Sequence, residues 1–265
     1  MTTVQAAGLG LAIAVVLMIV IWLASLVRRD ASLVDRFWGA GFALLALGYW
    51  GTAPPVEGRA AVGRLALLVM VLAWGLRLSG YLTWRNWGRG EDYRYREMRA
   101  RGGRSFPLTS LVTVHLLQGG IMWFVSLVLM AGLRGAPRLS NPWFGLGAAL
   151  WAIGLFFETA GDWQLARFRA DPANLGQVLD RGVWRYSRHP NYFGDAAAWW
   201  GFYLCAGAGD GWWAVVSPVV MTGLLLKVSG VVMLERRLTG TKPQYRDYMA
   251  RTSPFLPLPP RRDRT

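Results

Sequence analysis

Several long apolar runs constrain this chain most, because they approach or exceed the length of a helix that crosses a bilayer. In the hydrocarbon core of a membrane, backbone N–H and C=O groups must be satisfied internally, which only helices and closed barrels achieve. Apolar residues make up 54% of the chain, and it contains 15 tryptophans, a residue enriched at membrane interfaces. The sequence therefore predicts an all-α, polytopic membrane protein.

We expect seven transmembrane helices within a single integral membrane domain that covers residues 1–265. The expected helices are Ala6–Val27, Leu33–Trp50, Val62–Trp84, Thr109–Leu133, Pro142–Trp163, Tyr192–Ala208 and Trp212–Leu234. The first run has no basic stretch before it and is too long for the apolar region of a signal peptide. We therefore expect it to be retained as a helix.

Composition also excludes several classes of site. Cys205 is the one cysteine, so an internal disulfide is impossible, and His115 and His189 are too few for a histidine-rich metal site. We expect His115 to be a satisfied packing residue. The net charge of +14 would favour nucleic-acid binding in a soluble protein, but here the cations fall in loops between apolar helices. Membrane topology and a polyanionic small ligand explain this charge better, and no nucleic-acid motif is present.

The segment Arg181–Asp195, RGVWRYSRHPNYFGD, carries the densest set of polar groups and stands directly before an apolar run. Its arginines are planar, permanently charged donors that suit phosphate or carboxylate. Pro190 predicts the start of a helix, which places Asn191 and Asp195 on one face of its first turns. A basic loop that touches anionic lipid is the alternative, although lipid headgroups do not require His-Pro-Asn-Tyr before an acid.

Charged residues within or at the ends of the expected helices are costly in a bilayer and are therefore candidates for function. They are Asp35, Arg77, Glu158, Asp162, Lys227 and Glu235. Trp74, Arg77 and Tyr81 share one helical face. We predict that these polar groups line one cavity that opens to the cytoplasm.

Each of these residues also has a simpler explanation. The cations can reach the interface along their flexible stems, and Asp35 can cap its helix. Glu91, Asp92 and Glu97 are expected to form surface ion pairs with neighbouring arginines.

Several motifs, in matching order, resemble the steroid 5-alpha-reductase-like family, in particular its bacterial DUF1295 branch. The resemblance covers most of the chain and is densest from about Gly145 to Leu258. The matching stretches are RHPNYFGD (188–195), SLVDRFWG (32–39), WGLRLSGYL (74–82), GEDYRYREMR (90–99), ETAGDWQLARFRADP (158–172), LERR (234–237) and YRDYMARTSPFLP (245–257).

The resemblance implies a reductase of the bacterial inner membrane that binds NADPH from the cytoplasmic side. Such an enzyme reduces a carbon–carbon double bond conjugated to a carbonyl in an apolar, steroid- or lipid-like substrate. The part at about 145–258 would bind the cofactor. Its residues carried over from the family, or lying in the same motifs, are Asp162, Arg169, Arg185, Tyr186, Arg188, His189, Asn191, Tyr192, Asp195, Arg236 and Tyr245. A strand followed by G-x-G-x-x-G is missing from the sequence, so a Rossmann site is not expected.

The candidate catalytic residues are Asp35, Trp74, Arg77 and Tyr81. The family's third-helix motif has a tyrosine as proton donor, and the aligned residue here is Trp74, which cannot donate that proton. The family's Gln-Glu pair is also missing, and Asp35 is expected to take part of its role.

Two other functions stay open on the sequence. Membrane methyltransferases that act on isoprenylated cysteine share an Arg-His-Pro motif and bind S-adenosylmethionine, but they are less acidic just after it than Gly194-Asp195. A lipid-binding protein or a transporter would explain a polar cavity but not the anion-binding motif.

The distribution of cations predicts an outside N-terminus and a cytoplasmic C-terminus, because basic loops stay on the cytoplasmic side. Most arginines lie in the first, third and fifth connections and in the tail, whereas the other side holds only Arg59, Arg64, Arg134 and Arg138. A phosphatase fused to the C-terminus should therefore be inactive, and a fluorescent reporter in its place active. An active phosphatase fusion would overturn this topology.

Overall fold

The computed structural model describes residues 1–228, 231–242 and 244–261, without the side chains of residues 228, 232, 233, 236 and 237. Within these residues the structure is helical and contains no strand, which confirms the expected fold class. Four of the described helical segments are long and apolar enough to cross a bilayer: Thr3–Arg28, Gly58–Asn86, Tyr93–Arg134 and Pro142–Ala170. The total of seven spans stays a prediction.

The chain forms two compact units, the first made of Met1–Phe144 and Cys205–Ser217, and the second of Gly145–Leu204 and Pro218–Thr265. The helices of the first unit are α1 (Thr3–Arg28), α2 (Leu33–Arg36), α3 (Trp38–Gly51), α4 (Gly58–Asn86), α5 (Tyr93–Gly102), η1 (Gly103–Ser105), α6 (Phe106–Ser110), η2 (Leu111–Leu116), α7 (Leu117–Val125), α8 (Leu127–Arg134) and η5 (Gly211–Val215). The second unit holds most or all of α9 (Pro142–Ala170), η3 (Pro172–Asn174), η4 (Gly182–Arg185), α10 (Pro190–Gly207), α11 (Val216–Gly223), η6 (Leu224–Val228), α12 (Val231–Thr241) and α13 (Tyr245–Arg251).

Small residues bring the helices of the first unit close together. A Cβ atom on Gly39 of α3 would lie 2.2 Å from the carbonyl oxygen of Gly75 on α4, so the two backbones are in direct contact. The fully buried Tyr49 of α3 packs over Gly10 of α1, and its hydroxyl lies 2.9 Å from the Ser126 Oγ. Close backbone approach through small residues is the usual way in which helices associate in lipid.

Two arginines of the first unit form hydrogen bonds to the backbone of its connecting segments. Arg64 is buried, and it donates to the carbonyl oxygens of Pro54 at 2.6 Å and Gly135 at 2.7 Å. Arg134 donates to the carbonyl oxygens of Met1 at 2.6 Å and of Thr52. These arginines therefore satisfy backbone groups that the helices leave unpaired.

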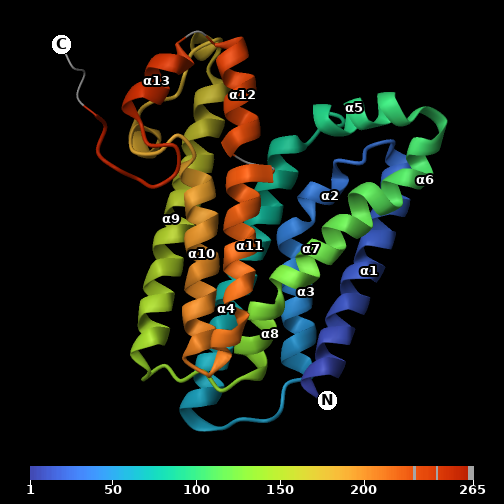
Figure 1. The fold of residues 1–265 in the computed structure, drawn as a ribbon, viewed down its shortest axis with the longest axis vertical. Helices are drawn as coiled ribbons and strands as arrows, with labels where there is room; N and C mark the ends of the chain where they lie inside the picture. The colour runs from blue at the N-terminus through green and yellow to red at the C-terminus, as the bar shows by residue number, and fades with distance from the viewer. Residues whose placement is uncertain (229–230, 243, 262–265) are drawn as a thin grey trace. The chain divides into compact units, whose positions relative to one another are not determined.

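In the second unit, α9 and α10 lie side by side (Figure 1). Glycines at heptad spacing bring their backbones into contact. A Cβ on Gly154 would lie 2.5 Å from the Gly194 carbonyl oxygen, and one on Gly201 would lie 2.6 Å from the Gly147 carbonyl oxygen. α10 is joined to α11 by a hydrogen bond of 3.2 Å from Trp200 to Thr222. These contacts explain why α9 to α11 lie side by side.

Three of the expected helices are interrupted. The expected helix 33–50 is divided at Phe37 into α2 and α3. The expected helix 109–133 begins as α6, widens into the π-helical η2, and continues as α7 and α8. The expected helix 212–234 is divided among η5, α11, the π-helical η6 and α12. A π turn inserts an extra residue, and it is frequent at functional sites, whereas hydrophobic periodicity cannot reveal it. Pro190 begins α10, as predicted.

We expect Gly154→Ala to lower stability, because the added Cβ would collide with the Gly194 backbone and force α9 and α10 apart. The expected loss is about 1–3 kcal/mol, measured as a lower melting temperature in detergent. Gly145→Ala on the same helix is the matched control. Its Cβ meets nothing within 4 Å, so stability should be unchanged or raised. Equal melting temperatures for the two variants would refute this account of the packing.

Candidate functional site

A chain of hydrogen bonds surrounds Asp35 in the first unit. Arg94 Nη2 donates to Asp35 Oδ2 at 2.7 Å, and the Tyr95 hydroxyl donates to Oδ1 at 2.7 Å. Gln118 Nε2 in turn donates to the Tyr95 hydroxyl at 3.1 Å. Asp35 is therefore a bound carboxylate that orients a tyrosine, and its side chain makes no helix-capping bond among the described residues.

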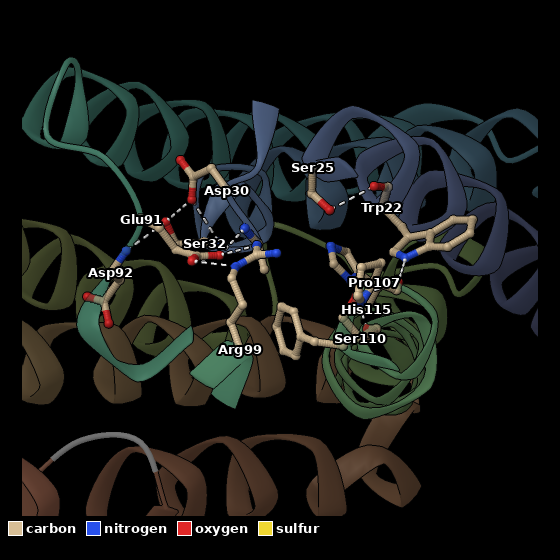
Figure 2. A network of polar contacts seen from close by, with 12 residues as sticks. Trp22, Ser25, Asp30, Ser32, Glu91, Asp92, Arg99, Pro107, Ser110 and His115 are labelled. Atoms are coloured by element: carbon tan, nitrogen blue, oxygen red, sulfur yellow. Dashed lines mark hydrogen bonds and ion pairs between the residues drawn. The ribbon is translucent and has the colours of Figure 1, made fainter. Parts of the chain in front are cut away.

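A second polar cluster anchors the segment before α5 (Figure 2). Glu91 accepts from the Ala31 N–H at 2.7 Å and from two nitrogens of Arg99 at 2.8 Å and 3.0 Å. Ser32 accepts from the Asp92 N–H at 3.2 Å and donates to Asp30. These bonds hold Tyr95 and Arg94 next to Asp35, because they fix the start of α5 against the turn before α2.

The expectation of surface ion pairs was wrong for Glu91, whose side chain is only 7% exposed. Burial alone would raise the pKa of the Glu91 carboxyl, but hydrogen bonds from Arg99 and the Ala31 amide outweigh it and lower the pKa. The expectation holds for Glu97, which pairs with Arg101 at the surface.

His115 is also not fully satisfied, contrary to expectation. It lies in the π-helical η2 and is fully buried, with its Nδ1 3.0 Å from the Ser110 carbonyl oxygen (Figure 2). Its Nε2 is buried and has no partner among the described residues. The π turn thus directs one unpaired ring nitrogen into the interior of the first unit.

The predicted catalytic residues of α4 occupy different environments. Trp74 is fully buried against Phe42, with the ring centroids 5.8 Å apart. Tyr81 is half-buried, and the guanidinium groups of Arg77 and Arg85 each lie 5.6 Å from its ring centroid. These cation–π contacts stabilise the two positively charged guanidinium groups next to the tyrosine ring.

In the second unit, Arg188 joins the RHP motif to the C-terminal segment. Its Nε donates to Glu235 Oε1 at 2.7 Å, and Nη1 donates to the carbonyl oxygens of Met249 at 2.9 Å and Thr252 at 2.5 Å. Its backbone N–H donates to Ser253 O at 2.9 Å. Arg188 is thus occupied by protein acceptors, which favours a structural role over direct phosphate binding.

The tail after α13 lies on this motif. Ser187 Oγ donates to Phe255 O at 2.7 Å, and Leu258 N donates to Tyr186 O at 3.0 Å. The Phe255 ring contacts Phe193 of α10. The tail therefore folds back as an extended strap within the second unit.

His189 is held between a carboxylate and an aromatic ring. Its Nε2 lies 3.3 Å from Glu235 Oε1, and its ring stacks on Tyr192 with the centroids 5.5 Å apart. Burial of Glu235 would raise the pKa of its carboxyl, but hydrogen bonds from His189 and Arg188 outweigh burial and hold that pKa below its ordinary value of 4.5.

Polar side chains also gather where α9 meets the start of α10. Asn191 Nδ2 donates to Asp162 Oδ1 at 3.4 Å, and both Asp162 and Glu158 are buried. Asp195 is half-buried one helical turn after Asn191. The structure thus brings Asp162 and Asn191 together, as their shared role in the sequence prediction requires.

The remaining predicted cofactor residues differ in exposure. Arg169 and Arg185 are exposed and Tyr186 is 44% exposed, whereas Tyr245 is buried near Tyr248. The side chain of Arg236 lies outside the described residues. The described residues of the second unit therefore combine buried carboxylates and a half-buried carboxamide with exposed guanidinium groups. No cluster of metal-binding side chains occurs in the described part of the chain.

The sequence profile of a family described as a protein of unknown function, DUF1295, matches residues 21–252. This chain belongs to the DUF1295 family. The DUF1295 protein is also 26% identical over 275 residues to an uncharacterized protein of Schizosaccharomyces pombe, covering 94% of this chain and 78% of that relative. No solved structure matches it significantly.

A second relative carries a functional name. This DUF1295 protein is 36% identical over 114 residues to the 3-oxo-5-alpha-steroid 4-dehydrogenase 1 of Bos taurus, which covers 42% of this chain and 44% of the relative. Together with the family match, this partial similarity supports a steroid 5-alpha-reductase-like family.

Two polar residues of the first unit were not identified as site residues from the sequence. Tyr95 and Gln118 complete the hydrogen-bond chain to Asp35, yet Tyr95 stood within a run of arginines and Gln118 was the one amide in an apolar helix. A polar amide within an otherwise apolar expected helix was the available signal for Gln118.

Glu235→Gln should lower the melting temperature of this DUF1295 protein at pH 7, because it removes a carboxylate bound by Arg188 and His189. The lowered pKa of Glu235 means that its stabilising effect is complete above pH 4.5 and is lost as the pH falls through the lowered pKa. The variant should therefore lose less stability than the wild type on acidification below that pH. Glu57→Gln, at an exposed position, is the control. Parallel acid profiles for Glu235→Gln and wild type would contradict the prediction.

Proposed function

We propose that this DUF1295 protein is an NADPH-dependent membrane reductase. Its substrate would be an apolar, steroid- or lipid-like molecule with a carbon–carbon double bond conjugated to a carbonyl. The observation that carries the proposal is the pairing of Asn191 with buried Asp162 beside an arginine-rich segment. The name of the bovine relative supports the same class of reaction.

The second unit offers the chemical groups that a dinucleotide needs. Asn191, Asp162 and Asp195 present amide and carboxylate groups for ribose or nicotinamide. The exposed guanidinium groups of Arg169 and Arg185 suit phosphates, and one of them could take the 2′-phosphate in a bidentate contact. Arg188 and His189 would act indirectly, because they hold Glu235 and the C-terminal segment in place. NADPH, when bound, supplies the hydride.

The first unit would supply the proton chemistry. Asp35 orients the Tyr95 hydroxyl, and Gln118 donates to the same oxygen. We propose that Tyr95 takes the donor role that Trp74 cannot fill, because Trp74 is fully buried and has no acidic hydroxyl. The single Tyr95 hydroxyl hydrogen, which Asp35 accepts here, would turn from Asp35 to the substrate. After hydride transfer to the β-carbon, this hydrogen would supply the proton that the α-carbon takes up. Arg77 and Tyr81 stay proposed members of this site.

Cofactor binding tests the proposal directly. NADPH should raise the melting temperature of purified protein more than NADH, because a ligand of the native state stabilises it by mass action. Arg185→Ala should reduce the preference for NADPH, whereas Arg138→Ala removes one exposed arginine elsewhere and should not. Equal affinity for the two nucleotides, or a response to S-adenosylmethionine alone, would reject the proposal.

Asn191→Ala should weaken NADPH binding by about 1–3 kcal/mol, because it removes the hydrogen bond to Asp162 and a polar contact. This range corresponds to roughly five- to more than hundredfold in affinity. Asp195→Asn keeps the shape and removes the charge, which separates electrostatic from steric effects. Calorimetric titration gives the affinity, and the melting temperature without cofactor gives the stability. Variants that melt early but bind NADPH normally would show that these residues only stabilise α10.

A further inference from the structure

The first unit carries an apolar groove of about 600 Å³ between α4 and the junction of α2 with α3. Leu76, Gly80 and Thr83 line it from a single face of α4, since they recur at the spacing of helical turns, and Trp87 lines it just after the helix ends. Phe37 and Ala40 line the opposite side. This groove face differs from the face of Trp74, Arg77 and Tyr81 that the sequence singled out.

The groove contains donors but little net charge. Arg36 lines it, and among the described residues its one hydrogen bond runs from Nη2 to Asp30 Oδ2 at 3.0 Å. Its Nη1 therefore keeps its hydrogens available. Ser79 Oγ also lines the groove; it accepts from the Ala40 N–H at 2.7 Å, and this leaves its own hydrogen to donate.

The ion pair with Asp30 decides what kind of ligand these donors suit. The Arg36 charge is already balanced by Asp30, and both side chains are largely buried, at 11% and 13% exposed. A full anion would gain little net attraction here and would lose its hydration. A neutral carbonyl oxygen needs only hydrogen-bond donors, so it fits this end of the groove better.

We propose that this groove binds the apolar substrate, with the substrate's ketone oxygen at Arg36 and Ser79 and its apolar body along α4. Trp84 and Trp87 would cover the far part of that body, since they are 66% and 75% exposed and line the groove. The inference rests on the proposed reductase function and adds the residues that recognise the substrate. Arg36 and Ser79 would hold the carbonyl through hydrogen bonds that strengthen as charge develops on its oxygen, and Tyr95 would keep the separate role of proton donor to the α-carbon.

Gly80 allows the groove to be blocked without disturbing the fold. A Cβ on Gly80 meets nothing within 4 Å, so Gly80→Phe fills the groove from an open position. Gly8 of α1 is equally open and lies away from the groove residues, which makes Gly8→Phe the matched control. The probe is a radiolabelled 3-oxo-4-ene steroid, measured by equilibrium binding to protein in lipid nanodiscs.

Gly80→Phe should weaken steroid binding by about tenfold or more, because the ring occupies space that the apolar body needs. Gly8→Phe should bind as the wild type does, and both variants should keep wild-type NADPH affinity. Wild type should bind the matching steroid without the 3-oxo group more weakly, because Arg36 and Ser79 then lose their acceptor.

A thiol at the same position gives an independent test. The native Cys205 is fully buried, so Gly80→Cys adds a single accessible thiol for maleimide. The 3-oxo-4-ene steroid should slow its labelling, and Gly8→Cys should be unaffected. Protection by fatty acid but not by steroid would identify the occupant as bilayer lipid and overturn the proposal.

The results also separate this inference from the proposed function. Wild-type steroid binding in Gly80→Phe, or no steroid binding by the wild type, would reject the groove as the substrate site even if NADPH binds. If Gly80→Phe loses steroid binding but the wild type does not bind NADPH, the groove is supported as the steroid site and the proposed reductase function is rejected.

Discussion

The cost of leaving a polar group unpaired among apolar helices governs both units of this protein. No water in the bilayer core can replace a missing partner, so a buried polar group is stabilised by partners within the chain. Arg64 donates from Nη1 and Nη2 to carbonyl oxygens of two connecting segments, and Arg188 donates to Glu235 and to carbonyl oxygens at the end of α13. In both cases one guanidinium fixes segments that are distant in sequence.

The same requirement links structure to the proposed chemistry. In the first unit, Glu91 and Arg99 fix the start of α5, and this places Tyr95 on Asp35. In the second unit, Arg188 and Ser187 hold the C-terminal strap on the RHP motif, just before the helix that carries Asn191. The groups proposed to bind substrate and cofactor are therefore positioned by buried polar contacts. Hydrogen bonds are directional, so they orient these groups more strictly than apolar packing does.

Two buried features are unusual enough to matter for function. The π turn of η2 holds His115 with an unpaired ring nitrogen, and α3 and α4 touch backbone to backbone at Gly39 and Gly75. Close contact at these glycines sets how far apart α3 and α4 lie, and the proposed substrate groove lies between α4 and the start of α3. A groove of this kind depends on small residues that let helices touch in one place and diverge in another.

The sequence by itself determined the helical membrane fold, the family, and the start of α10 at Pro190, because these follow from apolar run length, local motifs and the fixed backbone of proline. Only the tertiary structure decided the partners. The sequence predicted that Arg188 binds phosphate, but in the structure its guanidinium donates to carbonyl oxygens beyond residue 248. The sequence predicted that Glu91 forms a surface ion pair, but in the structure the Glu91 side chain is largely buried and accepts from the Ala31 amide. Tyr95 gained its link to Asp35 in the same way. Such hydrogen bonds join residues that are far apart in the chain. Local sequence patterns cannot predict which donor lies near which acceptor, because the fold decides it.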